Sequence, residues 1–188
     1  MKVKKLLVLV ALLTLWGGTM MFADAASQKV RIAVNGSDLG EVGLLSDGTT
    51  YLPLRQISGT LQSLIIWDDA NKKVTINKPN VHMTTFNDKN APFGKVTKGS
   101  KTPFWVWAQV DSLYTDITAI KVVIVDPSRK EKLIQSLKVT TRKDNFQVLT
   151  EQVKYDFVEA GNYPVRMYMM QAGSEEWTLV SEKLIISE

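Results

Sequence analysis

The sequence lacks cysteine altogether, and its 188 residues include a single histidine, His82. Without cysteine the chain forms no disulfides, and an exported chain of this kind has no thiol to carry a lipid anchor. We therefore expect core packing alone to hold the fold. Hydrophobic residues make up 45% of the chain and charged residues 22%, which is typical of a globular protein. The length suits one or two small domains.

Catalytic groups are also scarce. No serine motif stands near His82, and the chain lacks both a Gly-x-Ser-x-Gly turn and a glycine-rich phosphate loop. Glu175 and Glu176 are neighbours whose side chains would point to opposite faces of a strand. Asp111 and Asp116 do not have the ligand spacing that calcium requires. The sequence therefore predicts a protein that is not an enzyme and that uses no metal or other cofactor.

No apolar run reaches the roughly 20 residues of a membrane-spanning helix. The run from Leu6 to Trp16 is shorter and is followed by a Gly-Gly pair. It lies between the basic segment Met1–Lys5 and the small-x-small sequence Ala23-Asp24-Ala25, which is typical of a secretory signal peptide. We predict a signal peptide over residues 1–25, cleaved near Ala25, with retention as a membrane anchor as the alternative. The mature chain would be secreted, extracellular or associated with the cell wall, with no membrane span.

The net charge of +4 belongs mostly to the signal. Cleavage after Ala25 removes three lysines and one aspartate, which lowers the net charge to +2. A mild positive charge does not indicate a nucleic-acid partner, although it is compatible with loose attraction to anionic wall polymers. Cysteine-free export resembles the habit of bacteria with one membrane and a thick wall. We expect the partner to be a cell-wall polymer or an extracellular protein.

Residues 26–78 show the pattern of a small α+β domain. Val30, Ile32 and Val34 alternate with other residues as in a half-buried strand, and Asn35-Gly36 is a strong hairpin signal. Pro53 suits the first turn of a helix, because its missing N–H has no partner there. Further strands are expected at residues 41–45, 49–52, 64–67 and 72–77. This order predicts a small antiparallel sheet folded against a single helix.

Four short segments of this region carry a family resemblance. They are Val34-Asn35-Gly36, Asp47-Gly48-Thr49-Thr50-Tyr51-Leu52-Pro53-Leu54-Arg55, Ile66-Trp67-Asp68 and Val74-Thr75-Ile76. Over residues 28–78 the chain resembles the copper amine oxidase N-terminal-like domain, also called the stalk domain. The resemblance implies a small antiparallel sheet wrapped on one helix, used as a surface module of secreted bacterial proteins.

The resemblance does not imply oxidase chemistry. In those enzymes the copper site lies in a different domain and needs several histidines, which His82 alone cannot supply. One departure is that the family usually has Leu-Gly at the end of the helix, where this chain has Leu61-Gln62-Ser63. Arg55 and Asp68 could form a polar binding pair. The alternative, which we favour, is that Arg55 caps or pairs within the domain and Asp68 starts a turn.

Residues 79–188 read entirely as strands. About seven strands separated by turns predict a β-sandwich. The segment from Glu159 to Val165 is similar to the Asp-x-Gly-x-Tyr-x-Cys corner of immunoglobulin-like domains, with Val165 in the place of the cysteine. Pro164 inside this strand suggests that one side of the strand is unpaired. The predicted fold class is therefore a small α+β domain followed by an all-β immunoglobulin-like sandwich.

Trp105 and Trp107 are the candidate ligand-binding residues. They are two apart on a strand and so share a face, where they could form a platform for sugar rings or for a protein partner. We expect them instead to be buried, because both faces of Phe104–Val110 are apolar. The chain is thus predicted to be a non-catalytic surface or cell-wall-associated protein. The alternative is an extracellular module or inhibitor that presents the loops Asp126–Lys130 or Gln171–Glu175 to a protein.

Overall fold

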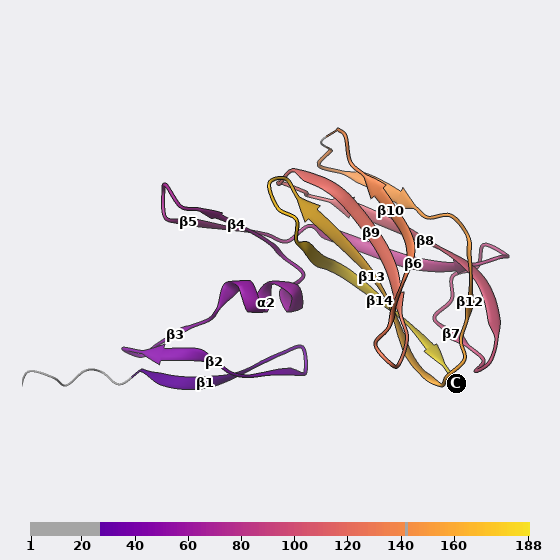
Figure 1. Cartoon of the computed structure of the whole chain (residues 1–188), viewed down its shortest axis with the longest axis horizontal. Coiled ribbons are helices and arrows are strands. Elements are labelled where there is room, and N and C mark those ends of the chain that lie inside the picture. The colour runs from indigo at the N-terminus through magenta and orange to yellow at the C-terminus, as the bar shows by residue number, and fades with distance from the viewer. Residues whose placement is uncertain (1–26, 142) are drawn as a thin grey trace, which may run out of the picture. The chain divides into compact units, whose positions relative to one another are not determined.

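The computed structural model describes residues 27–141 and 143–188. The predicted signal peptide, residues 1–25, lies outside these ranges. The chain divides into two units, one ending at Pro53 and one running from Leu54 to Glu188. Each unit is described by itself below, and Figure 1 gives the order of the elements along the chain. The predicted domain boundary between residues 78 and 79 stays a prediction.

The first unit is a three-stranded antiparallel sheet. Its strands are β1 (Gln28–Val34), β2 (Ser37–Ser46) and β3 (Thr49–Tyr51), in the order β1-β2-β3. Two-residue turns at Asn35-Gly36 and Asp47-Gly48 join the strands, and all four residues have positive φ. Paired positive φ values are characteristic of the type I′ hairpin turn, which explains why the Asn-Gly and Asp-Gly pairs stand there.

The second unit begins with the one helix of the described residues, α2 (Leu54–Leu61), which follows Pro53 directly. Ile57 is buried on its inner face. The helix ends in a Schellman motif, because the N–H of Ser63 donates to the carbonyl of Ser58 and that of Gln62 to the carbonyl of Gly59. Gln62 therefore holds the left-handed position, with φ of 54°. The family's usual glycine would suit that conformation better.

A two-stranded ribbon follows the helix. Strand β4 (Leu64–Asp68) pairs antiparallel with β5 (Lys73–Asn77), and Trp67 lies opposite Val74. Both strands were predicted within one residue of their ends. Leu64 at the start of β4 is fully buried and packs into the core of the sandwich, whereas Trp67 is 49% exposed.

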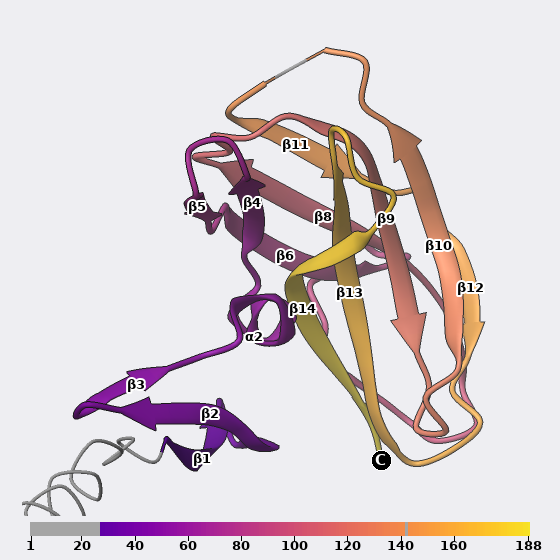
Figure 2. The ribbon, with the colours of Figure 1, turned by 60° about the vertical axis from the view of Figure 1, so that its left-hand side comes forward.

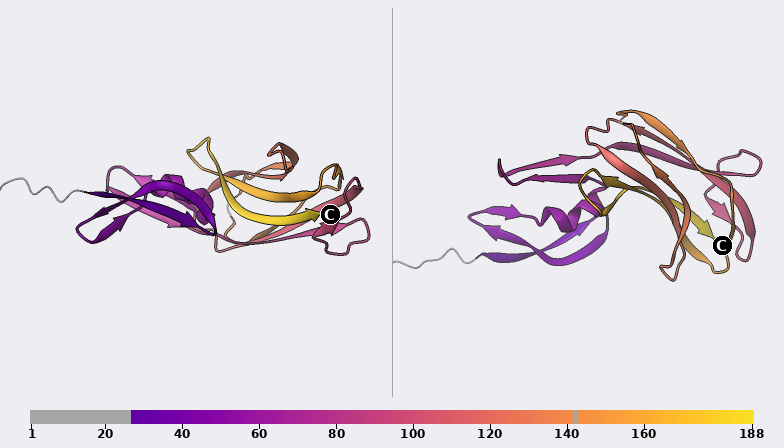
Figure 3. Two further views of the ribbon diagram at one scale, coloured as in Figure 1. Left: turned by 90° about the horizontal axis from the view of Figure 1, so that it is seen from below. Right: turned by 45° about the horizontal axis from the view of Figure 1, so that its top comes forward.

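The rest of the second unit is a β-sandwich of two sheets. One sheet has the order β10-β9-β13-β14-β7, and the other consists of β11 and β12 paired to β8, with β6 on the other side of β8. Figures 2 and 3 show the two sheets from three directions, with β13 and β14 side by side. The strands are β6 (Asn80–Asn87), β7 (Lys95–Val96), β8 (Lys101–Asp111), β9 (Ile117–Val125), β10 (Glu131–Lys138), β11 (Phe146–Leu149), β12 (Val153–Asp156), β13 (Gly161–Gln171) and β14 (Trp177–Ser187).

The core of the sandwich lies between these sheets and is built mainly from apolar and aromatic side chains, with a few buried hydroxyl residues such as Thr85. Phe104, Val106, Ala108 and Val110 of β8 alternate with outward residues and are fully buried. They meet Val165, Met167 and Met169 of β13 in one core cluster. Met167 and Met169 are fully buried there, and such flexible apolar side chains fill gaps in a core.

The predicted tyrosine corner is present at the start of β13. The Tyr163 hydroxyl donates to the carbonyl of Glu159 at 2.9 Å and accepts from its N–H at 3.0 Å. Val165, in the place of the cysteine, is fully buried. The pairing of β13 with β9 begins only at Val165, so Pro164 has a partner strand on one side alone. The predicted fold class, a small α+β region followed by an immunoglobulin-like sandwich, is confirmed.

Candidate functional site

The outer face of the β6–β8–β11 sheet carries the two candidate tryptophans. Because β8 buries its even-numbered residues from Phe104 to Val110, Trp105 and Trp107 point away from the core. Both indoles are half-buried. The sequence favoured burial over exposure, and the structure places both indoles between these two states. Strand β8 is apolar on both faces because one face packs into the core and the other carries the outward tryptophans.

Neighbouring strands complete this surface. Residues directly opposite each other on paired strands share a face. Phe86 of β6 lies opposite Trp105, and Leu149 of β11 lies opposite Trp107. We call Phe86, Trp105, Trp107 and Leu149 the tryptophan face. Leu149 is 60% exposed, so this set is an apolar patch reachable from solvent.

The indoles are held in fixed orientations. The rings of Phe86 and Trp105 stack with centroids 4.4 Å apart and planes 12° from parallel. The Nε1–H of Trp105 donates to Oδ1 of Asn90 at 3.3 Å, and that of Trp107 donates to Oε1 of Gln147 at 3.4 Å. An aromatic surface that is already ordered loses little side-chain entropy on binding.

Polar groups border the tryptophan face. Gln109 and Gln147 lie opposite each other on β8 and β11, and Gln109 donates to the carboxylate of Asp111 at 2.9 Å. His82 of β6 lies opposite Gln109 and is exposed. Amide side chains both donate and accept hydrogen bonds, so this border could bond to hydroxyl groups of a ligand stacked on the rings. The tryptophan face and its polar border can be recognised only when the register of β6, β8 and β11 is known. Sequence reasoning therefore found only Trp105 and Trp107.

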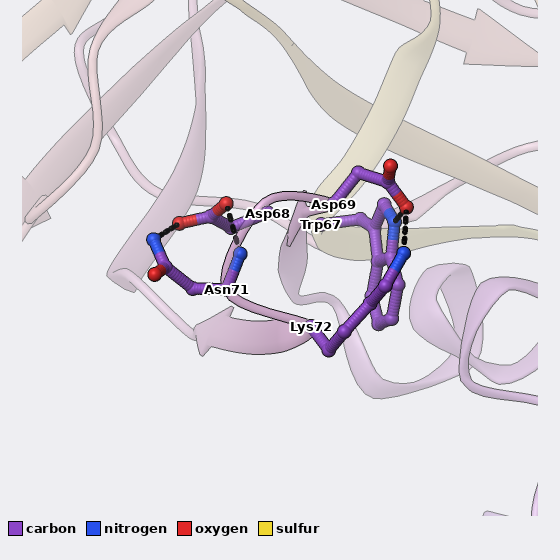
Figure 4. A network of polar contacts seen from close by, with 5 residues as sticks. All are labelled: Trp67, Asp68, Asp69, Asn71 and Lys72. Carbon is purple, nitrogen blue, oxygen red and sulfur yellow. Dashed lines mark hydrogen bonds and ion pairs between the residues drawn. The ribbon is translucent and has the colours of Figure 1, made fainter.

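A second polar cluster stands at the turn of the β4–β5 ribbon (Figure 4). The carboxylate of Asp68 accepts from the backbone N–H of Asn71 at 3.1 Å and from its side-chain amide at 2.8 Å. These bonds, the side-chain bond first, lower the pKa of Asp68. Asp68 is therefore a turn residue, as expected. Within the described residues it forms no pair with Arg55, whose carbonyl accepts from the Ser58 hydroxyl inside α2.

Asp69 in the same turn orients an exposed tryptophan. Its carboxylate accepts from Lys72 at 2.8 Å and from Nε1–H of Trp67 at 3.3 Å. These two bonds lower its pKa, with the lysine contributing more. Sequence reasoning used Trp67 only as part of the family segment Ile66-Trp67-Asp68 and gave its side chain no role. The network explains how the turn is fixed, and we assign it no ligand.

The chemistry of a copper centre is not supported by the residues present. Copper bound through nitrogen ligands needs several imidazoles, and the sequence has only His82. Among residues 27–141 and 143–188, no three His, Cys, Asp or Glu side chains are grouped so that they could hold a metal ion. The same residues contain no helix that is long and apolar enough to cross a membrane.

Comparison with known families agrees with this description. Residues 33–103 match the model of the copper amine oxidase N-terminal domain family, a non-catalytic, stalk-like domain. The resemblance stated from the sequence is thereby confirmed, and residues 33–103 are similar to this domain. The match runs from β1 into β8, beyond the predicted end at residue 78. A search of the curated proteins found no match.

Proposed function

We propose that this chain is a secreted, non-catalytic bacterial surface protein that binds a cell-wall polymer through the tryptophan face. The observation that carries the proposal is the pre-ordered pair of outward indoles, Trp105 and Trp107, with amides at their border. Sugar rings present apolar C–H faces that pack on aromatic rings, and their hydroxyls bond to side-chain amides. The stalk-type domain, the predicted signal peptide and the mild positive charge are consistent with a place at the cell wall.

Sedimentation with purified cell-wall sacculi tests the proposal. Residues 26–188 would be mixed with sacculi that retain or lack wall teichoic acid, at low and at high salt. Because stacking on indoles involves no net charge, we expect retention that survives high salt and the removal of teichoic acid. Retention that disappears under either condition would show charge attraction alone and would contradict the proposal.

Paired variants locate the contact. Trp105→Ala with Trp107→Ala is expected to reduce retention at least about tenfold, since a stacked aromatic anchor contributes more than about 1.4 kcal/mol to binding. Trp177→Ala is the matched control, because Trp177 is also half-buried but lies on β14 beneath Lys121. Equal loss in both variants would contradict a role for the tryptophan face. Absence of retention under all conditions would favour a soluble protein partner bound through Asp126–Lys130 or Gln171–Glu175.

A further inference from the structure

A cavity of about 340 Å³ opens at the end of the sandwich where β9 begins and β10 ends. β9 and β10 belong to one sheet, and β11, which supplies the opposite wall, belongs to the other. β10 and β11 are each the first strand in the order of their sheets. The cavity therefore enters the space between the two sheets from one open edge of the sandwich.

The walls of the cavity are mostly apolar, with Thr115 and Gln147 as polar members. The apolar lining residues include Ile117, Ile120, Leu137, Val139, Phe146 and Val148. Ile120 and Val148 are almost fully buried and also belong to the core cluster of the sandwich. The inner end of the cavity is thus continuous with the core. Atoms that face an empty cavity lack packing contacts on that side, and a bound apolar group would supply these contacts.

The rim of the cavity has one sign of charge. Lys138 and Lys143 are exposed and are the charged side chains among the described lining residues, which include no carboxylate. Thr140 and Thr141 also belong to the lining. A mostly apolar interior lined at its rim by two lysines and two threonines is complementary to a molecule with an apolar chain and an anionic head.

The volume limits the size of the occupant. Pockets for small molecules span about 300–1,000 Å³, so this cavity lies near the lower end of the range. It has room for one short chain and not for the paired chains of a membrane lipid. We propose that the cavity binds a single medium-chain fatty carboxylate, with the chain between the sheets and the carboxylate at Lys138 and Lys143. The proposal does not depend on the binding of wall polymer by the tryptophan face.

Calorimetric titration with decanoate, below its micelle concentration, tests the proposal. We expect saturable binding of one decanoate per chain. Acetate, which has the charge without the chain, and decyltrimethylammonium, which has the chain with the opposite charge, should each bind at least about tenfold more weakly. Equal binding of acetate would show a surface charge effect only, and equal binding of the ammonium compound would show unselective apolar adsorption. Either result, or no binding of decanoate, would overturn the proposal.

Variants place the ligand in this cavity. Lys138→Gln with Lys143→Gln should weaken decanoate binding about tenfold, because two exposed charge contacts are lost, and should leave the binding of uncharged decanol unchanged. Lys183→Gln on β14, which is outside the cavity lining, is the matched control. Val139→Phe should reduce the binding of both ligands by filling the entrance. Methyl NMR shifts confined to Ile117, Ile120 and Leu137 would support the site, whereas shifts confined to other residues would overturn it.

Discussion

Gln62 holds a backbone conformation that favours glycine. Its φ of 54° places it in the left-handed region at the end of α2, which costs an L-residue about 1–2 kcal/mol. Glycine would remove this cost but would add about 0.4–1 kcal/mol of unfolded-chain entropy. We therefore expect Gln62→Gly to raise the free energy of unfolding by about 0.5–1 kcal/mol, measured by urea denaturation.

The control for this change is the same substitution six residues earlier, inside the helix. Gln56 is exposed inside α2, where glycine is unfavourable by about 1 kcal/mol. Gln56→Gly should therefore lower stability while Gln62→Gly raises it. A loss of stability in both variants would show that the side chain of Gln62 matters more than its backbone conformation.

We expect the free energy of unfolding to depend on pH through the titration of Tyr155. Burial first, and then the negative charge of Asp126, raise its pKa to about 12. The pKa of an unfolded tyrosine is about 10, so the folded state keeps the proton at higher pH. The stability that Tyr155 contributes is therefore complete below about pH 10 and is lost as pH rises toward about 12.

Replacing Tyr155 by phenylalanine tests this origin of alkaline sensitivity. The ring contacts with Phe157 and Tyr163, at centroid distances of 4.9 and 5.9 Å, would remain. We expect Tyr155→Phe to match the natural protein near pH 7 and to lose less stability between about pH 10 and 12, as measured by urea unfolding at each pH. Parallel loss of stability in the two proteins would show that other groups cause the alkaline sensitivity.

At the scale of elements, the corner before β13 depends on one hydroxyl. Tyr163 is 1% exposed, and its hydroxyl makes both bonds to the backbone of Glu159. Two ordinary hydrogen bonds contribute about 1–2 kcal/mol in total. We expect Tyr163→Phe to lower the free energy of unfolding by about 1–2 kcal/mol, the contribution of these two hydrogen bonds. Tyr168→Phe on the same strand removes a hydroxyl that bonds to the exposed Glu131 and to Arg166 at the surface, and it should change stability by less than about 0.5 kcal/mol. Equal effects would contradict a special role for the corner.

The elements that could be predicted from sequence are those with local signals. Asn35-Gly36 and Asp47-Gly48 require positive φ, and Tyr163 brings its own bonding partner four residues away, so neither depends on distant parts of the chain. Strand β7, by contrast, is two residues long and pairs in parallel with the far end of β14. Two residues carry no period, so no sequence pattern could have indicated it.

The orientation of β8 shows a similar limit for the candidate site. Phe104–Val110 is apolar at every position except the polar Gln109, so alternation cannot tell which face is the core. The answer depends on which residues of β6 and β11 lie opposite each tryptophan, and that register is set by the whole sheet. Composition therefore identified Trp105 and Trp107, and only the fold placed them outward with Phe86.

At the scale of the whole molecule, the residues that share the core of the sandwich indicate where one domain ends and the next begins. Leu64 falls within the region of the family resemblance, yet it is fully buried in the core cluster that includes Phe104 and Val165. Helix α2 also packs against β14 of the sandwich. Both observations place residues 54–78 in one packed unit with the sandwich.

Fragments measure how strongly this segment supports the sandwich. Loss of a buried leucine from a core costs about 2–5 kcal/mol, so we expect residues 79–188 to be less stable than residues 54–188 by at least this amount in urea unfolding. Leu64→Ala within 54–188 should reproduce most of the difference. Leu61→Ala, a half-buried control at the end of α2, should cost less. Equal stability of the two fragments would instead show that the sandwich is independent from residue 79, because the burial of Leu64 would then add nothing to its core.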